Sequence, residues 1–235
     1  WMLKEVRRRF ANTRAITKEH IFYYVYGLLH AQDYRETFSA DLKKELPRIP
    51  IVESLDDFMA FSKAGKALAE LHLHYDSFAA ETARSANRNS AAPYALVADK
   101  RIKYDVSKPS HNAPQIFLDG AVISVDDIPE AALHIDKMRF ATKEDKSQII
   151  YNSRITLKNI PLVAYDYIVN GKSAIEWILE RYQVKTDKDS GLLNDPNDWA
   201  SEHHYPAYIL KLLLSVIDLS VKSVGIVKGL PRVGV

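Results

Sequence analysis

The sequence predicts an α+β fold: an N-terminal helical segment followed by a mixed domain of short antiparallel strands, hairpins and C-terminal helices. Apolar residues recur at helical spacing before residue 82, whereas β-type runs dominate between residues 115 and 157. A small, polar and aperiodic stretch, residues 83–93, separates the two patterns and is typical of a linker. We therefore expect a helical spacer over residues 1–82 and an α+β domain over residues 94–235.

Three helices are predicted in the first segment. Thr17 is placed to cap the first, whose apolar face carries Ile21, Tyr24, Val25 and Leu28. The second carries Tyr34, Phe38 and Leu42 and ends before Pro47, because proline disfavours helix in the residue before it. Ser54 opens the third, with Asp57 completing an approximate capping box. The apolar stripe of the third helix is formed by Phe58, Phe61, Leu68, Leu71 and Tyr75.

The middle of the chain predicts strands. Asp119 and Gly120 divide residues 115–125 into two β runs, which is a strong hairpin signal. A second strand pair is expected from residues 138–141 and 148–157, with the charged residues 143–146 as the connecting turn.

Helices are predicted again towards the C-terminus. Residues 161–169 form a short helix that ends at Asn170 and Gly171, an αL pair. Ser173 and Glu176 form a capping box for the next helix, which has a core stripe of Ile175, Ile178, Leu179 and Tyr182. A last long helix spans residues 206–227, with Ile209, Leu212, Leu213, Val216 and Leu219 facing inward.

Composition places only broad limits on function. The chain has no cysteine, so thiolate zinc sites, disulfides and a cysteine nucleophile are excluded. It shows no apolar run long enough to span a bilayer and no signal segment, so we expect a cytoplasmic protein without a membrane partner. The first residue is Trp1 rather than Met, which leads us to expect a fragment of a longer protein.

Catalytic and metal-binding signatures have little support. The sequence contains no GxSxG, P-loop or GxGxxG motif, and no adenine-methylase motif of the NPPY type. His72 and His74 lie about 200° apart around a helix, so they do not share one ion. Asp187 and Asp189 resemble the start of a calcium loop, but tying down a tight turn explains them better. We expect no catalytic residue, metal or cofactor in this chain.

Basic residues give the best functional hypothesis. The net charge is only +2, but residues 84–160 hold 12 basic and 9 acidic side chains. Lys and Arg neutralise phosphates, and Arg also forks onto guanine in the major groove. The candidate DNA-binding residues are Lys100, Arg101, Lys103, Tyr104, Lys108, Lys137, Arg139, Lys143, Lys146, Arg154 and Lys158. The alternative, that these are ordinary solvated charges, stays open. Packing explains Trp177 and Trp199 better than base stacking.

Several strings along the chain resemble one family. They include Leu46-Pro-Arg-Ile-Pro50, Tyr104-Asp-Val-Ser-Lys-Pro-Ser110, Gly171-Lys-Ser-Ala-Ile-Glu-Trp177, Glu180-Arg-Tyr-Gln-Val184 and Asn194-Asp-Pro-Asn-Asp-Trp199. They are similar to the C-terminal end of Type ISP single-chain restriction–modification enzymes. In that family the full-length enzyme combines a nuclease, an ATP-driven helicase-like motor, an adenine methylase and a target recognition domain.

The resemblance implies that this chain is the helical spacer and target recognition domain, which reads double-stranded DNA and is not itself an enzyme. S-adenosylmethionine, ATP and Mg²⁺ are implied for the full-length enzyme rather than for this part. The methylase and motor of the same polypeptide are implied as partners. The alternative is a structural or coupling domain that packs on the methylase and motor without reading bases. An independent metal-dependent nuclease is a third hypothesis, but no clustered D…ExK pattern supports it.

Overall fold

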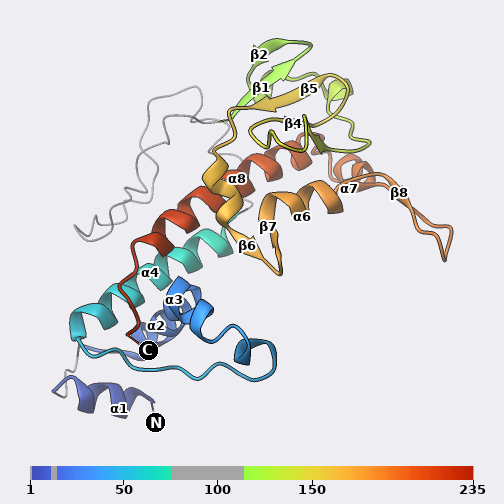
Figure 1. Ribbon diagram of the computed structural model, residues 1–235. Coiled ribbons are helices and arrows are strands. Elements are labelled where there is room, and N and C mark those ends of the chain that lie inside the picture. The colour runs from blue at the N-terminus through green and yellow to red at the C-terminus, as the bar shows by residue number, and fades with distance from the viewer. Residues whose placement is uncertain (1, 12–14, 76–113, 235) are drawn as a thin grey trace. The chain divides into compact units, whose positions relative to one another are not determined.

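The computed structural model describes residues 2–11, 15–75 and 114–234 (Figure 1). They form two compact units. The helical unit contains the described residues up to Leu73 and those from Gly225 onward; the mixed unit contains those from His74 to Val224. The predicted linker, residues 83–93, lies outside the described residues, so the predicted domain boundaries remain predictions. Helices with small antiparallel sheets confirm the predicted α+β class.

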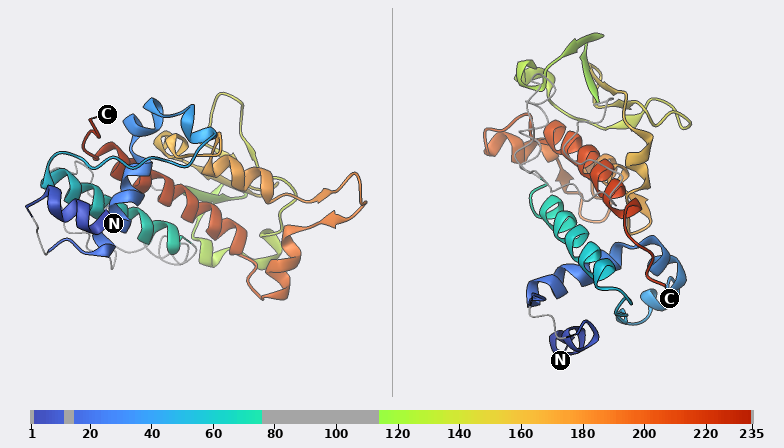
Figure 2. Two further views of the ribbon diagram at one scale, coloured as in Figure 1. Left: turned by 90° about the horizontal axis from the view of Figure 1, so that it is seen from below. Right: turned by 90° about the vertical axis from the view of Figure 1, so that its left-hand side faces the viewer.

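The helical unit is built on two closely packed helices. Its elements are α1 (Met2–Arg9), α2 (Lys18–His30), α3 (Gln32–Thr37), η1 (Asp41–Lys43) and α4 (Leu55–Leu73). A Cβ atom added at Gly65 would lie 1.8 Å from the backbone oxygen of Tyr23, and one at Gly27 would lie 2.4 Å from that of Phe61. Only glycine therefore permits the observed approach of α2 and α4 (Figure 2).

Two of the three predicted N-terminal helices are confirmed with their caps. The Thr17 side chain accepts a hydrogen bond from the backbone N–H of His20 at the start of α2. The Ser54 hydroxyl accepts one from Asp57 at the start of α4. The second predicted helix is wrong in its length, because α3 ends at Thr37 with Phe38 as its C-cap and a separate 3₁₀ turn follows.

A five-stranded antiparallel sheet is the centre of the mixed unit. Its strands are β1 (Gln115–Leu118), β2 (Ala121–Ile123), β3 (Arg139–Phe140), β4 (Ile149–Ile150) and β5 (Ile155–Lys158), in the order β2-β1-β5-β4-β3. The hairpin predicted at Asp119 and Gly120 is confirmed, and both residues have positive φ, as a type I′ turn requires. Short 3₁₀ turns η2 (Val125–Asp127) and η3 (Glu130–Ala132) follow β2.

The prediction of one strand over residues 148–157 is wrong. The segment folds back as the hairpin of β4 and β5, with Ile150 opposite Thr156. Asn152 organises the turn: its side-chain oxygen accepts from the backbone N–H groups of Arg154 and Ile155. Its amide also donates to two carbonyl groups, those of Ala132 and His134. The chain therefore reverses direction at Asn152, within a run of residues that otherwise resembles one strand.

The helix predicted over residues 161–169 is also wrong. A 3₁₀ turn, η4 (Leu162–Asp166), leads into β6 (Ile168–Val169), which pairs with β7 (Lys172–Ser173). Asn170 and Gly171 have φ values of 49° and 85°, so the αL pair forms a hairpin turn instead of a helix end. The same two-residue signal serves both structures.

The remaining helices follow from their caps. The predicted Ser173–Glu176 capping box opens α6 (Ala174–Arg181). A hairpin of β8 (Lys185–Thr186) and β9 (Leu193–Asn194) leads to α7 (Pro196–Glu202), whose N-cap is Asp195. The predicted last helix is confirmed as α8 (Tyr208–Lys228). No helix within the described ranges is long and apolar enough to cross a membrane.

Candidate nucleic-acid interface

Six of the predicted DNA-binding residues are described, and all belong to the mixed unit. Lys137, Arg139, Lys143, Lys146, Arg154 and Lys158 lie on β3, on β5 or on the segments that connect the strands. The other five, Lys100, Arg101, Lys103, Tyr104 and Lys108, lie outside the described residues. Their role in DNA binding remains a prediction.

Lys146 is held by an ion pair at a partly exposed position. Its ammonium group lies 2.9 Å from the Glu176 carboxylate. It also lies over the rings of Phe140 and Tyr165, at 5.5 and 5.4 Å. The bond from Lys146 is the largest cause that lowers the pKa of Glu176 to about 2, and the capping bonds from Ser173 add to it. Lys146 thus stabilises the start of α6.

Arg154 is also paired. Its guanidinium donates to both carboxylate oxygens of Asp119, at 2.6 to 3.2 Å, which joins the β4–β5 turn to the β1–β2 turn. The bond from Arg154 lowers the pKa of Asp119. Both side chains are about half exposed. The pair therefore sits in contact with solvent, where a phosphate can compete for Arg154.

The other predicted cations are more available. Lys158 lies over the Phe117 ring at 4.4 Å. Lys137, Arg139 and Lys143 are exposed and form no ion pair with any part of the chain that the structure describes. They lie close together in sequence. An isolated β-bridge joins Lys137 to Gln183, which lies two residues before the start of β8. These three residues are the uncommitted cations of the predicted site.

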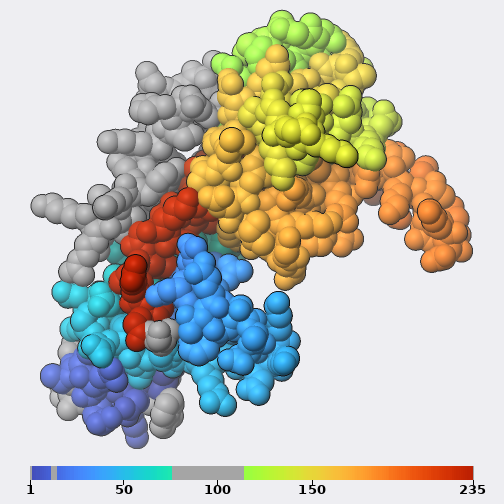
Figure 3. Space-filling view, in the orientation of Figure 1, coloured from blue at the N-terminus to red at the C-terminus, as the bar shows by residue number. Residues whose placement is uncertain are grey.

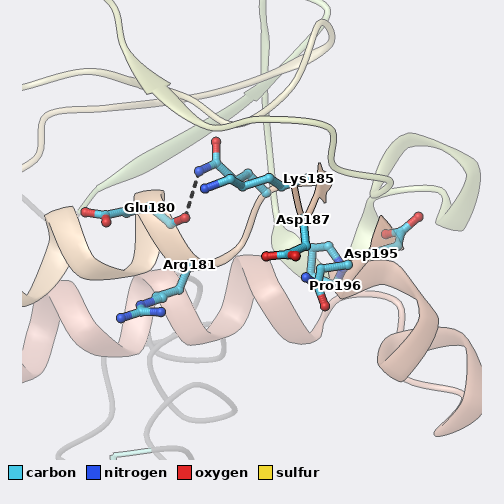
Figure 4. Close-up of a pocket in the computed structure, with 8 residues that line it drawn as sticks. Glu180, Arg181, Lys185, Asp187, Asp195 and Pro196 are labelled. Carbon is cyan, nitrogen blue, oxygen red and sulfur yellow. Dashed lines mark hydrogen bonds between the residues drawn. The ribbon is translucent and has the colours of Figure 1, made fainter. Parts of the chain in front are cut away.

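The bridge at Lys137 leads to a polar groove that the sequence did not single out. Its open volume is about 510 Å³, and it lies between the end of α6 and the start of α7 (Figure 4). The groove is lined by Glu180, Arg181, Gln183, Lys185, Asp187, Asn194, Asp195 and Pro196. The mix of guanidinium, ammonium and amide groups suits phosphates and base edges better than an apolar ligand.

The acidic residues of this groove are already engaged. Glu180 pairs with Lys172, whose ammonium group also lies over the Trp177 ring. Asp187 accepts three hydrogen bonds from the turn that follows it. Asp195 accepts from the backbone N–H of Asn197 as the cap of α7. Of these carboxylates, only Glu180 is paired with a cation, whereas Asp187 and Asp195 accept from neutral donors and keep their negative charges in the groove.

The two tryptophans take different positions. Trp177 is partly buried, donates to the Val169 carbonyl, and carries Arg181 as well as Lys172 on its ring. Trp199 is 43% exposed and stacks on His203 with the ring centroids 4.1 Å apart. Both rings thus make contacts within the chain, as the packing interpretation predicts, and Trp199 keeps an exposed surface.

Metal-binding geometry is absent from the described ranges. Within residues 2–11, 15–75 and 114–234, no group of three or more His, Asp or Glu side chains is placed to hold an ion. Nδ1 of His72 instead lies 2.7 Å from the Tyr26 hydroxyl, and burial is the main cause that lowers the pKa of His72 to about 4. The Asp187 loop closes a turn, as the sequence indicates.

Comparison with known proteins identifies the family. Residues 1–212 match the model of the Type ISP C-terminal specificity domain. A comparison with curated proteins found no match.

Solved structures give similar folds. A nuclease-deletion mutant of the Type ISP restriction–modification enzyme LlaGI, in complex with a DNA substrate mimic, is 35% identical with a TM-score of 0.67. The match covers 92% of this chain and 14% of that one. The ATP-dependent Type ISP enzyme LlaBIII bound to DNA is 32% identical with a TM-score of 0.67, over 97% of this chain and 12% of that one.

A third structure, the DrdV–DNA complex, is 28% identical with a TM-score of 0.64, over 97% of this chain and 19% of that one. The chain thus spans less than a fifth of the length of each of these proteins. With the family model matched over residues 1–212, this chain belongs to the Type ISP C-terminal specificity domain family.

Proposed function

We propose that the chain is the DNA target-recognition part of a longer restriction–modification enzyme, and that it binds double-stranded DNA without catalysing a reaction. The observation that carries the proposal is the match to the specificity-domain family over residues 1–212. The similar structures of LlaGI, LlaBIII and DrdV, each a complex with DNA or a DNA substrate mimic, support it.

The uncommitted cations are the proposed phosphate contacts. Lys137, Arg139 and Lys143 are exposed and unpaired within the described part of the chain, so binding a phosphate breaks no internal ion pair. Arg154 joins them if a phosphate displaces Asp119, whereas Lys146 stays with Glu176. Adenine methylation, DNA cleavage and ATP-driven translocation, with S-adenosylmethionine, ATP and Mg²⁺, belong on this proposal to other parts of the enzyme.

Selection from a random duplex library tests this function. The 235-residue chain is incubated with 30-base-pair duplexes of random sequence, and bound DNA is recovered, amplified and sequenced over several rounds. The proposal expects one enriched sequence. Recovery of DNA without enrichment would leave only non-specific binding, and no recovery at low salt would overturn DNA binding by this chain.

A second function has an observation of its own. On the helical unit, Phe22 is 62% exposed on α2 and Met59 is 37% exposed on α4. Met59 and Tyr23 line a groove of about 470 Å³ between these helices. This surface suits packing against the methylase or motor of the same polypeptide. In the full enzyme, a Phe22→Ser variant would then lose methylation and cleavage while the enriched sequence stays the same.

A further inference from the structure

The β8–β9 hairpin stands clear of the mixed unit. It leaves the end of α6, runs outward and returns to the start of α7 (Figures 1 and 3). Its strands pair in register, Lys185 with Asn194 and Thr186 with Leu193. A two-stranded ribbon is one of the few elements that the major groove of DNA admits, since that groove is about 12 Å wide.

The tip of the hairpin is held in one shape by its own hydrogen bonds. The Asp187 carboxylate accepts from the backbone N–H groups of Asp189 and Ser190 and from the Ser190 hydroxyl, at 2.8 to 3.1 Å. The Asp187 backbone bonds to Leu192 and Gly191, and Gly191 has a positive φ of 72°. A preorganised tip loses less conformational entropy on binding than a loose loop does.

Apolar and cationic groups share this hairpin. Leu192 is 68% exposed and Leu193 is 61% exposed, so two adjacent leucines meet solvent where the chain returns from the turn into β9. Lys185 and Lys188 are exposed, and neither forms an ion pair with a described residue. The hairpin also carries Asp187 and Asp189, so its formal charge is zero, and its affinity for a polyanion rests on where the lysines and the exposed leucines lie.

The base of the hairpin adds hydrogen-bonding groups. Arg181, Gln183 and Asn194 line the polar groove, where Glu180, Asp187 and Asp195 are bound internally. Asn and Gln amides match the adenine edge, and Arg matches guanine. In the major groove the apolar feature is the methyl group of thymine, which is the contact a leucine can make.

We propose that the β8–β9 hairpin enters the major groove of duplex DNA, with Leu192 and Leu193 against thymine methyl groups and Lys185 and Lys188 on the flanking phosphates. The inference rests on the proposed function, since it names the element that reads the bases. It assigns the reading to residues 185–194, which the predicted set of DNA-binding residues does not include.

Uracil substitution tests the leucine contact. Each thymine of the duplex enriched by the chain is replaced in turn by uracil, which removes only the C5 methyl group. Affinity is measured for the chain and for a Leu192→Ala/Leu193→Ala variant. We expect at least one uracil substitution to lower the affinity of the chain for the duplex about threefold to tenfold. The same substitution should leave the affinity of the double variant unchanged. The matched control is Leu46→Ala, a 90% exposed leucine of the helical unit.

Three outcomes are distinct. If no duplex is enriched, the proposed function fails and takes the inference with it. If a duplex is enriched, but uracil lowers the DNA affinity of the chain and of the double variant equally, or of neither, the leucines do not contact thymine. The inference is then wrong. If the double variant binds DNA with the affinity of the chain, the leucines do not contribute to DNA binding, and the inference is equally overturned.

Discussion

Lys146 and Glu176 form a 2.9 Å ion pair between the β3–β4 connection and the first turn of α6. We expect the pair to keep Lys146 from contacting DNA, although the sequence groups it with the candidate DNA-binding residues. Both side chains keep partial contact with solvent, with 39% and 30% of the side-chain surface exposed. The contribution to stability is therefore smaller than that of a fully buried pair.

Replacing Lys146 is expected to affect stability and leave DNA affinity nearly unchanged. A Lys146→Gln variant should lose about 0.5–1 kcal/mol in its free energy of unfolding at pH 7, because solvent screens this partly exposed pair. Denaturant unfolding followed by circular dichroism measures this loss. Lys44→Gln, an exposed lysine of the helical unit, is the control. A large loss of DNA affinity in a variant that stays folded would show that Lys146 contacts DNA.

The same ion pair predicts a pH dependence. The pKa of Glu176 is lowered from 4.5 to about 2, so the carboxylate is favoured in the folded state. The stabilisation is fully present above the unfolded pKa and is lost as the pH falls towards 2. The difference in unfolding free energy between the chain and Glu176→Gln should narrow between about pH 5 and pH 2. A difference that stays constant across this range would contradict the assignment.

Lys137, Arg139 and Lys143 are expected to set the salt dependence of binding. The logarithm of affinity falls by about 0.9 per phosphate contact for each decade of salt. Each substitution to Gln should reduce this slope by about 0.9, on specific and scrambled duplexes alike. Fluorescence anisotropy between 50 and 300 mM salt measures the slope. Unchanged slopes in all three variants would place the phosphate contacts elsewhere.

Asp119→Asn is expected to strengthen DNA binding. The substitution removes the carboxylate that holds Arg154 and leaves the guanidinium for a phosphate. Removing any acidic charge raises affinity slightly, so Asp198→Asn, an exposed aspartate of α7, is the matched control. Affinity at low salt should rise severalfold more for Asp119→Asn than for the control. An equal rise in both would leave Arg154 without a role in binding.

Gly65→Ala tests the packing of the helical unit. The added Cβ would meet the Tyr23 backbone oxygen at 1.8 Å, so α2 and α4 must move apart. We expect a loss of about 1–3 kcal/mol in unfolding free energy, as for other overpacked cores. Met59→Ala, at a partly exposed position of the same helix, is the control. A Gly65→Ala variant of unchanged thermal stability would contradict the close approach.

The sequence predicts the local features of this fold well and the long-range ones poorly. Thr17, Ser54 and Ser173 cap their helices as expected, because capping bonds span only three residues. The turn at Asn152 was missed because the amide bonds that support it reach back to Ala132 and His134.

The candidate site follows the same rule. Arg154 and Asp119 are 35 residues apart in the sequence and pair only because the fold brings their two turns together. No local sequence pattern reveals such a pair. Asp187 and Asp189 predict a tight turn, which is present, but the exposure of Leu192 and Leu193 beside it depends on residues distant in sequence. The family resemblance, in contrast, was readable from short strings and is confirmed.

The most direct test of sequence recognition is the ratio of affinities for the enriched duplex and a scrambled duplex of equal composition. The ratio is measured by competition with the 235-residue chain at rising salt. Phosphate contacts weaken on both duplexes together, whereas base contacts weaken little. We expect a ratio of about 10³ that persists as both affinities fall. A ratio near one at every salt concentration would contradict the claim that this chain reads DNA sequence.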